Sequence, residues 1–228
     1  MAPKVLIVLS SHSELGTTGK KTGWYLSEFA HPYKVLKDAG VSMTIASPSG
    51  GAAPLDPSSV EAAKDDSVSV DFLHNNSALW EVTHKVSDFL GKADEFDAIF
   101  FPGGHGPMFD LPLDKDSNAL IKEFWEKEKV VSAVCHGPAA LVNVKLGNGE
   151  LLLKGKQVTG FSNSEEDAVG LSSQMPFLLE DKLKEAGTKY DKTGDWGEKV
   201  IVDGRLITGQ NPASAHGVGE AILKAIKA

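Results

Sequence analysis

Residues 130–138 read VVSAVCHGP, a β-branched run that ends abruptly at Cys135 and passes through Gly137-Pro138 into a segment rich in Ala, Leu and Val. This pattern predicts a buried strand, a sharp turn and a helix. Small residues two positions before and after the cysteine, Ala133 and Gly137, meet the steric requirement of a nucleophile elbow. The stretch therefore predicts an α/β fold in which Cys135 lies at the carboxyl edge of a parallel sheet.

The position of Cys135 at the start of the expected helix indicates how reactive its thiol should be. Unpaired amides and partial positive charge at the start of a helix favour a thiolate over a thiol. We therefore expect a lowered pKa, an ionised sulfur near neutral pH and access to solvent. The alternative interpretation is a small buried residue at the end of a strand, which is the usual role of a lone cysteine.

The rest of the chain alternates short apolar runs with helical stretches, the pattern of a mostly parallel sheet with helices on both faces. Strands are expected at 4–9, 41–47, 96–101, 130–134, 157–160, 199–202 and 205–208. Asp203-Gly204 between the last two predicts a late β-hairpin. A helix is expected from Leu26 to its end at Gly40, with a kink or restart near Pro32, and further helices are expected at 117–127, 177–186 and 213–227. The stretch at 48–67 is expected to be a long excursion.

Length, net charge and cysteine count limit the classes of protein to which this chain could belong. The 228 residues show no repeat and no linker, so residues 1–228 are taken as one domain. A net charge of −8 disfavours nucleic-acid and anionic-membrane partners. One cysteine excludes an intrachain disulfide, and the apolar run at 5–9 is too short to cross a bilayer. We expect a cytoplasmic protein, and a nuclear location is also compatible with the composition.

A second glycine-rich turn, PGGHGP at 102–107, follows the predicted strand at 96–101. Loops after parallel strands open at the same edge of the sheet, so this turn should lie near Cys135. The amides of Gly104 and His105, with that of His136, are candidates for an oxyanion hole. The alternative is a turn that binds nothing. The loop lacks the spacing of a nucleotide-binding turn, and no histidine pair has zinc-site spacing, so neither a cofactor nor a metal is expected.

The segments PGGHG (102–106), AVCHGP (133–138) and NPASA (211–215) resemble the ThiJ/PfpI superfamily, which has the class I glutamine amidotransferase-like fold. The string KTGWYLSEFAHPY (21–33) narrows the resemblance to the branch of fungal heat-shock chaperones and glutathione-independent glyoxalases (glyoxalase III). It covers nearly the whole chain. The resemblance implies a flavodoxin-like three-layer sandwich, a homodimer and a Cys-His-Glu catalytic set.

The resemblance also assigns roles to residues. It implies that Cys135 is the nucleophile, His136 its neighbouring imidazole and Glu166 the acidic member, with the adjacent Glu165 as the alternative. Glu28 matches a second acidic residue beside the cysteine. A carboxyl near a thiolate has a raised pKa and can carry a proton. The alternative roles are a first-turn helix acid for Glu165 or Glu166 and a solvent-facing glutamate for Glu28.

The remaining histidines are weaker candidates for the active site. His12, His74 and His84 lie in polar stretches and are read as surface residues. His216 lies roughly where amidotransferases of related fold place a catalytic histidine. Those enzymes pair it with an acid two residues later, and this chain has Val218 there. A glutaminase is therefore disfavoured, and lining the pocket is the role left for His216.

The resemblance implies cofactor-free conversion of methylglyoxal, a small 2-oxoaldehyde, and water to D-lactate through a Cys135 hemithioacetal. No metal, nucleotide or glutathione is expected. Two other functions remain open. One is a stress-related holdase chaperone, and the other is a cysteine peptidase or deglycase that uses the same thiol.

Overall fold

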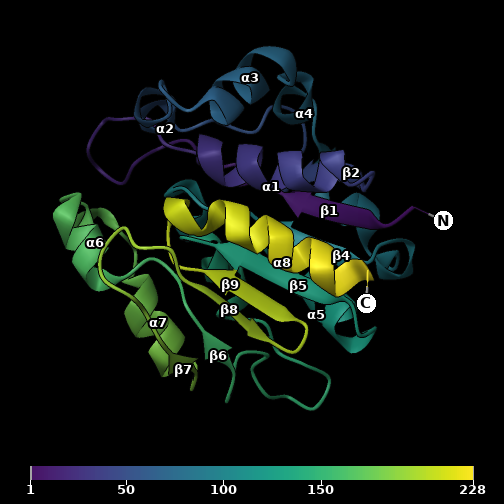
Figure 1. The fold of residues 1–228 in the computed structure, drawn as a ribbon. Coiled ribbons are helices and arrows are strands. Elements are labelled where there is room, and N and C mark those ends of the chain that lie inside the picture. Colours follow the sequence, from purple (N-terminus) through teal and green to yellow (C-terminus); the bar gives the residue numbers. More distant parts are fainter. Residues whose placement is uncertain (1, 228) are drawn as a thin grey trace.

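A seven-stranded sheet in the order β3-β2-β1-β4-β5-β9-β8 runs through the centre of the protein (Figure 1). In this computed structural model, which describes residues 2–227, every neighbouring pair of strands is parallel except β8 and β9. The strands are β1 (Lys4–Val8), β2 (Ser42–Ser47), β3 (His84–Lys85), β4 (Ala98–Phe101), β5 (Val130–Val134), β8 (Val200–Asp203) and β9 (Leu206–Gly209). The predicted α/β class is confirmed.

Helices cover both faces of this sheet. α1 (Leu26–Asp38) and α8 (Ala215–Lys227) lie side by side on one face, and α5 (Lys115–Glu126) lies on the other (Figure 1). α1 and α8 approach so closely that a Cβ on Gly219 would lie 2.8 Å from Cα of Pro32. Because water reaches neither face, every residue of β4, β5 and β9 is buried, which explains their continuous apolar runs.

Shorter elements surround the central layers. α2 to α4 lie outside α1, and α6 and α7 lie beyond the carboxyl ends of the central strands (Figure 1). The bounds are α2 (Pro57–Ala62), α3 (Ser67–Asn75), α4 (Ala78–Glu81), α6 (Asn163–Ala168), α7 (Leu179–Glu185), β6 (Gln157–Val158) and β7 (Lys189–Tyr190). The 3₁₀ turns are η1 (Val86–Phe89), η2 (Ala93–Glu95), η3 (Gly106–Met108), η4 (Gly137–Leu141), η5 (Ser172–Gln174) and η6 (Pro212–Ser214). No helix within residues 2–227 combines the length and the apolar character needed to cross a bilayer.

The structure differs from the sequence-based expectations in three places. The strand expected at 157–160 is only Gln157–Val158, and it pairs with β7 in a separate two-stranded sheet, because β8 already occupies the free edge of β9. The helix containing Pro32 does not restart there but continues to Asp38, and Gly219 of α8 approaches the proline closely. The excursion at 48–67 contains α2, which Asp56 caps by accepting from the amide of Ser58.

The late hairpin is confirmed. β8 and β9 are antiparallel, Asp203 pairs with Leu206, and Gly204 takes φ 60° in the turn between them. A tight hairpin turn requires a left-handed backbone conformation of this kind, which glycine adopts readily. The hairpin adds the only antiparallel strand among the described strands of the main sheet.

Candidate active site

Cys135 occupies a strained elbow at the carboxyl end of β5. Its φ is 60°, an unfavourable value for a residue with a side chain, and such strain costs about 1–3 kcal/mol. The backbone is held on both sides, since the Cys135 amide donates to Gly209 O and the Cys135 carbonyl accepts from the amide of Phe161. A Cβ on Gly137 would lie 2.2 Å from Phe101 O, so only glycine fits there. The elbow is as predicted, but a 3₁₀ turn, not an α-helix, follows it.

The thiol is more enclosed than its position in the sequence suggests. Cys135 is only 3% exposed. Burial, followed by the charge of Glu28, raises the pKa of Cys135 well above its usual value, and the opposing hydrogen bond from the Gly104 amide is weaker. The expectation of an ionised, solvent-presented sulfur is wrong for the unliganded protein, because desolvation outweighs the amides of one short turn. A partner must therefore take the thiol proton during any reaction.

Glu28 supplies one titratable group beside the sulfur. Its side chain is fully buried, and its Oε2 accepts from the Gly103 amide at 2.7 Å. Its Oε1 is buried with no hydrogen-bond partner among the described residues, and the thiol of Cys135 lies near enough to the carboxyl to act on its pKa. Burial is the largest cause that raises the pKa of Glu28 to about 8. Glu28 is therefore neutral at pH 7, and it can give a proton and take one back. The solvent-facing alternative is excluded.

His136 supplies the second group. Its Nδ1 lies 3.5 Å from Cys135 Sγ, and its Nε2 lies 2.5 Å from Oε2 of Glu166. Burial, and then the charge of His105, lowers the pKa of His136, so the ring is neutral at pH 7. An ionised Glu166 requires the proton on Nε2, which leaves the Nδ1 lone pair facing the thiol. This arrangement suits a general base.

Glu166 joins two imidazoles. Its Oε1 lies 2.7 Å from Nε2 of His105, while its Oε2 bonds His136. Burial acts to raise the pKa of Glu166, but the two histidines outweigh burial and hold it well below its usual range. The side chain of His105, which was expected to contribute only its amide, therefore helps to hold the carboxylate that orients His136.

Glu165 points away from the sulfur. It is fully buried, and its carboxylate accepts from Ser162, from the amide of Trp196 at 2.9 Å and from Asn211 Nδ2 at 2.9 Å. Ser162 and Glu165 form a capping box at the start of α6. The choice between the two glutamates thus has a structural answer: Glu166 faces His136, and Glu165 joins the α6 cap to two other segments.

The glycine-rich turn after β4 lies directly against the sulfur. The Gly104 amide is the backbone donor that acts to lower the pKa of Cys135. Within residues 2–227 the amides of His105 and His136 donate to no other group. Gly103 and Gly104 leave no room for a Cβ, which would lie 2.5 Å from Glu28 Oε2 and 2.4 Å from Gly23 O, respectively. An oxyanion hole needs amide donors that are not already engaged, so these amides stay the candidates for the predicted oxyanion hole.

A pocket of about 560 Å³ opens above this cluster, with Gly104, His105, Cys135 and His136 in its lining. The ring of Phe161 lies 4.3 Å from that of His136, and Trp196 lies 5.8 Å beyond Phe161. Tyr25 also lines the pocket. Burial, and then the charge of Glu28, raises the pKa of Tyr25, so its hydroxyl stays neutral.

A metal ion is the other occupant that these side chains suggest. The candidate ligand atoms of His105, His136 and Glu166 lie within 4.8 Å of one another. Each imidazole nitrogen, however, is at hydrogen-bond distance from its own carboxylate oxygen, at 2.5 and 2.7 Å. Zinc would need its ligands at about 2.0–2.2 Å around a common centre. The side chains as they lie form a hydrogen-bonded trio and not a coordination shell.

The profile of the DJ-1/PfpI family matches residues 21–225, and this span includes every side chain of the cluster. The chain belongs to the DJ-1/PfpI family. It is 36% identical to glyoxalase 3 of Candida albicans, over 98% of each chain, and 34% identical to the glutathione-independent glyoxalase HSP31 of Saccharomyces cerevisiae, over 100% of each. It superimposes on the crystal structure of glyoxalase III from Candida albicans with a TM-score of 0.89 at 33% identity, covering 98% of this chain and 97% of that one. The resemblance and the flavodoxin-like fold are confirmed.

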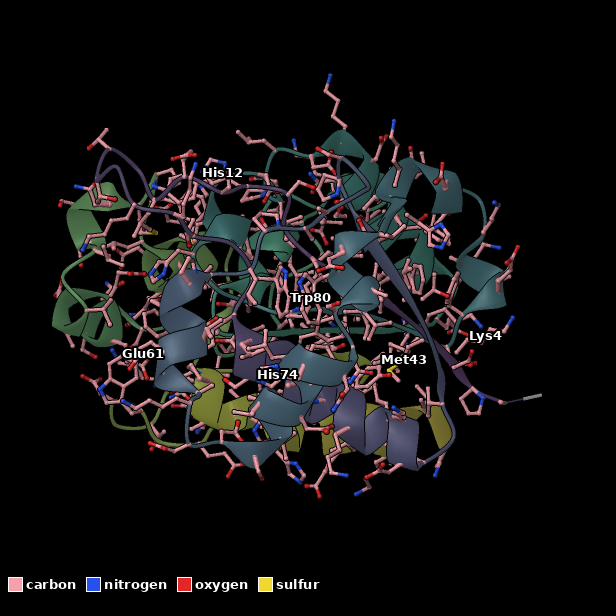
Figure 2. The ribbon with its side chains drawn as sticks, turned by 90° about the horizontal axis from the view of Figure 1, so that it is seen from above. Lys4, His12, Met43, Glu61, His74 and Trp80 are labelled. Atoms are coloured by element: carbon pink, nitrogen blue, oxygen red, sulfur yellow. The ribbon has the colours of Figure 1, made fainter. Side chains whose placement is uncertain are left out.

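Other histidines of this DJ-1/PfpI protein lie outside the cluster. Figure 2 labels His74 on α3 and His12 on the loop between β1 and α1. His74 and His84 are exposed as predicted, but His12 is half-buried, because its ring stacks on Phe109 at 4.5 Å. His216 does not line the pocket, since its exposed side chain lies 3.3 Å from Glu220 of α8.

Sequence reasoning missed Tyr25, Phe161 and Trp196. Tyr25 and Phe161 belong to the same sequence motifs as Glu28 and Glu166, respectively. Those motifs therefore could have indicated that the two aromatic residues lie in the site as well. Trp196 lies in a polar stretch with no periodicity, and its φ of 62° is visible only in three dimensions.

Proposed function

We propose that this chain is a glutathione-independent glyoxalase that converts methylglyoxal and water to D-lactate, with Cys135 as nucleophile. The observation that carries the proposal is the pair of groups beside one sulfur, a neutral carboxyl from Glu28 and a neutral imidazole from His136. The names of the full-length relatives support the same activity.

The first step makes a hemithioacetal. The sulfur of Cys135 bonds to the aldehyde carbon, and the thiol proton passes to Nδ1 of His136. Glu28 gives its proton to the aldehyde oxygen, and the free amides near Gly104 stabilise the charge on that oxygen as it develops. His136 becomes a cation, which the Glu166 carboxylate stabilises.

The second step moves hydrogen between the two carbons. The Glu28 carboxylate removes the proton from the former aldehyde carbon to give an enediolate, and returns that proton to the neighbouring carbon. The hydroxyl proton passes from the first oxygen to the second, which leaves a lactoyl thioester on Cys135. Water then attacks the thioester, Glu28 takes a water proton, and His136 returns its proton to the departing sulfur. These steps require neither an oxidant nor glutathione.

The decisive assay is D-lactate production from methylglyoxal by the purified protein without glutathione. Stereospecific detection separates D-lactate from L-lactate. Absence of any lactate would overturn the proposed function, and lactate formation that persists in Cys135→Ser would overturn the mechanism.

The other candidate activities can be assayed with the same purified protein. Peptides and glycated amines, assayed beside methylglyoxal, rank the peptidase and deglycase alternatives by kcat/KM. A holdase would suppress client aggregation equally well in Cys135→Ser. The family resemblance further implies a homodimer, which light scattering after size-exclusion chromatography tests. Fractionation of cells tests the expected cytoplasmic location.

A further inference from the structure

The pocket above Cys135 is larger than methylglyoxal requires. Its volume is about 560 Å³, within the range of about 300–1,000 Å³ found for sites that bury drug-sized ligands. Methylglyoxal is a three-carbon molecule that displaces only a few waters of about 30 Å³ each. Beyond the reacting groups, the lining includes six apolar side chains, those of Leu15, Phe161, Val169, Leu171, Trp196 and Pro212.

Trp196 is held in this lining by a buried anchor. The Trp196 amide donates to Oε1 of Glu165 at 2.9 Å, and the same oxygen accepts from Asn211 Nδ2. The residue keeps a left-handed φ of 62°, a conformation that persists only where the surroundings enforce it. Trp196 is 47% exposed although it has the largest apolar side chain of the pocket.

An aromatic path leads from this ring to the reacting groups. Trp196 lies 5.8 Å from Phe161, and Phe161 lies 4.3 Å from His136. A substrate whose aldehyde carbon meets the sulfur would therefore find aromatic faces beside its remaining substituent. Aromatic pairs at such separations are favourable beyond the area that they bury.

We propose that the pocket prefers 2-oxoaldehydes with an aromatic or extended apolar substituent over methylglyoxal, and that Trp196 sets this preference. The inference rests on the proposed function, because it names the substrate class of the same thiol. Phenylglyoxal is the simplest probe of this class.

The first test compares kcat/KM for phenylglyoxal and methylglyoxal. The wild type should favour phenylglyoxal at least tenfold, mainly through KM, which corresponds to about 1.4 kcal/mol. Trp196→Gly should reduce this ratio at least fivefold, and Trp196→Phe should keep most of it. Glycine adopts a φ of 62° without strain, so the variant should keep the loop conformation. Equal ratios in the wild type and Trp196→Gly would overturn the proposal.

Two controls guard this comparison. Val202→Ser changes an exposed apolar residue of β8 away from the pocket and should leave both rates unchanged. Phenylglyoxal also modifies arginine, and the single arginine of the sequence is Arg205, whose guanidinium donates to the carbonyls of Trp125 and Lys129. Arg205→Lys should therefore show the same preference for phenylglyoxal as the wild type.

A binding measurement separates this inference from the proposed function. Hydroxyacetone and 2-hydroxyacetophenone resemble the two aldehydes but lack the reactive aldehyde group. Calorimetry should show at least tenfold tighter binding of the aromatic ketol, with the difference reduced in Trp196→Gly. If neither aldehyde is turned over, the glyoxalase assignment fails and the calorimetry still decides the pocket preference. Equal affinities for the two ketols would overturn the preference alone.

Discussion

Nδ1 of His136 lies 3.5 Å from Sγ of Cys135, although the two residues are neighbours in the chain. Adjacent side chains usually diverge, and here the φ of 60° at Cys135 turns the backbone so that they meet. The strained elbow thus lifts the thiol and also brings its base within reach.

Replacement of the sulfur tests the nucleophile. Cys135→Ser keeps the size of the side chain but replaces the thiol by a far weaker acid, so D-lactate formation should fall by roughly 10³-fold or more. The free energy of unfolding should change by less than about 1 kcal/mol, because the volume is conserved. Suppression of client aggregation should be unaffected if a holdase function exists. Rates near those of the wild type would contradict nucleophilic catalysis.

The two adjacent glutamates form a matched pair of variants. Glu166→Gln removes the charge that orients His136, so kcat should fall by about 10²-fold or more while stability changes little. Glu165→Gln removes the shared anionic acceptor of the α6 cap and the Trp196 segment, and should destabilise the protein by about 2–4 kcal/mol. Measured kcat and denaturant unfolding separate the two effects. The reverse pattern would exchange the roles assigned here.

Glu28 should make stability depend on pH. Its pKa is about 8 in the folded protein and about 4.5 when exposed, so the folded state binds the proton more tightly. The contribution is fully present below about pH 4.5 and is lost as pH rises through about 8. Urea unfolding between pH 5 and pH 9 should show this decline in the wild type and a smaller decline in Glu28→Gln. Parallel curves would show that Glu28 is already ionised.

His105 should shift the acidic limb of the activity profile. Its charge contributes to the lowered pKa of His136, and a base must be neutral to accept the thiol proton. In His105→Gln the pKa of His136 should rise, so the acidic limb of kcat/KM moves to higher pH. The profile for methylglyoxal between pH 5 and pH 9 measures this shift. An unchanged limb with lowered kcat would leave His105 with a purely steric role.

Gly137 provides a test of the elbow itself. In Gly137→Ala the new Cβ would lie 2.2 Å from Phe101 O, a backbone atom that cannot move aside. Overpacking of this kind costs about 1–3 kcal/mol, and we expect the upper part of that range together with lost activity. Gly194→Ala is the control, because no atom lies within 4 Å of its Cβ position. Thermal unfolding of both variants measures the difference.

One sequence pattern distinguishes Glu165 from Glu166 without the structure. Ser162 and Glu165 stand three residues apart at the start of a helix, which is the pattern of a capping box. That pattern marks Glu165 as a helix-capping residue and leaves Glu166 free for His136. By contrast, no local pattern could place Trp196, since its position depends on contacts with Glu165 and Phe161, residues distant in the sequence.

The α/β class, the central strands, the hairpin at Asp203-Gly204 and the elbow at Cys135 could be determined from the sequence alone. Each depends on interactions within a few residues, namely periodic apolar side chains and the steric limits of glycine and proline. Only the tertiary structure decided the protonation of the sulfur, the contact of Glu166 with both His105 and His136, and the aromatic lining of the pocket. Desolvation and charge act through space, so the pKa of Cys135 depends on its burial and on Glu28, which the fold brings from another part of the chain.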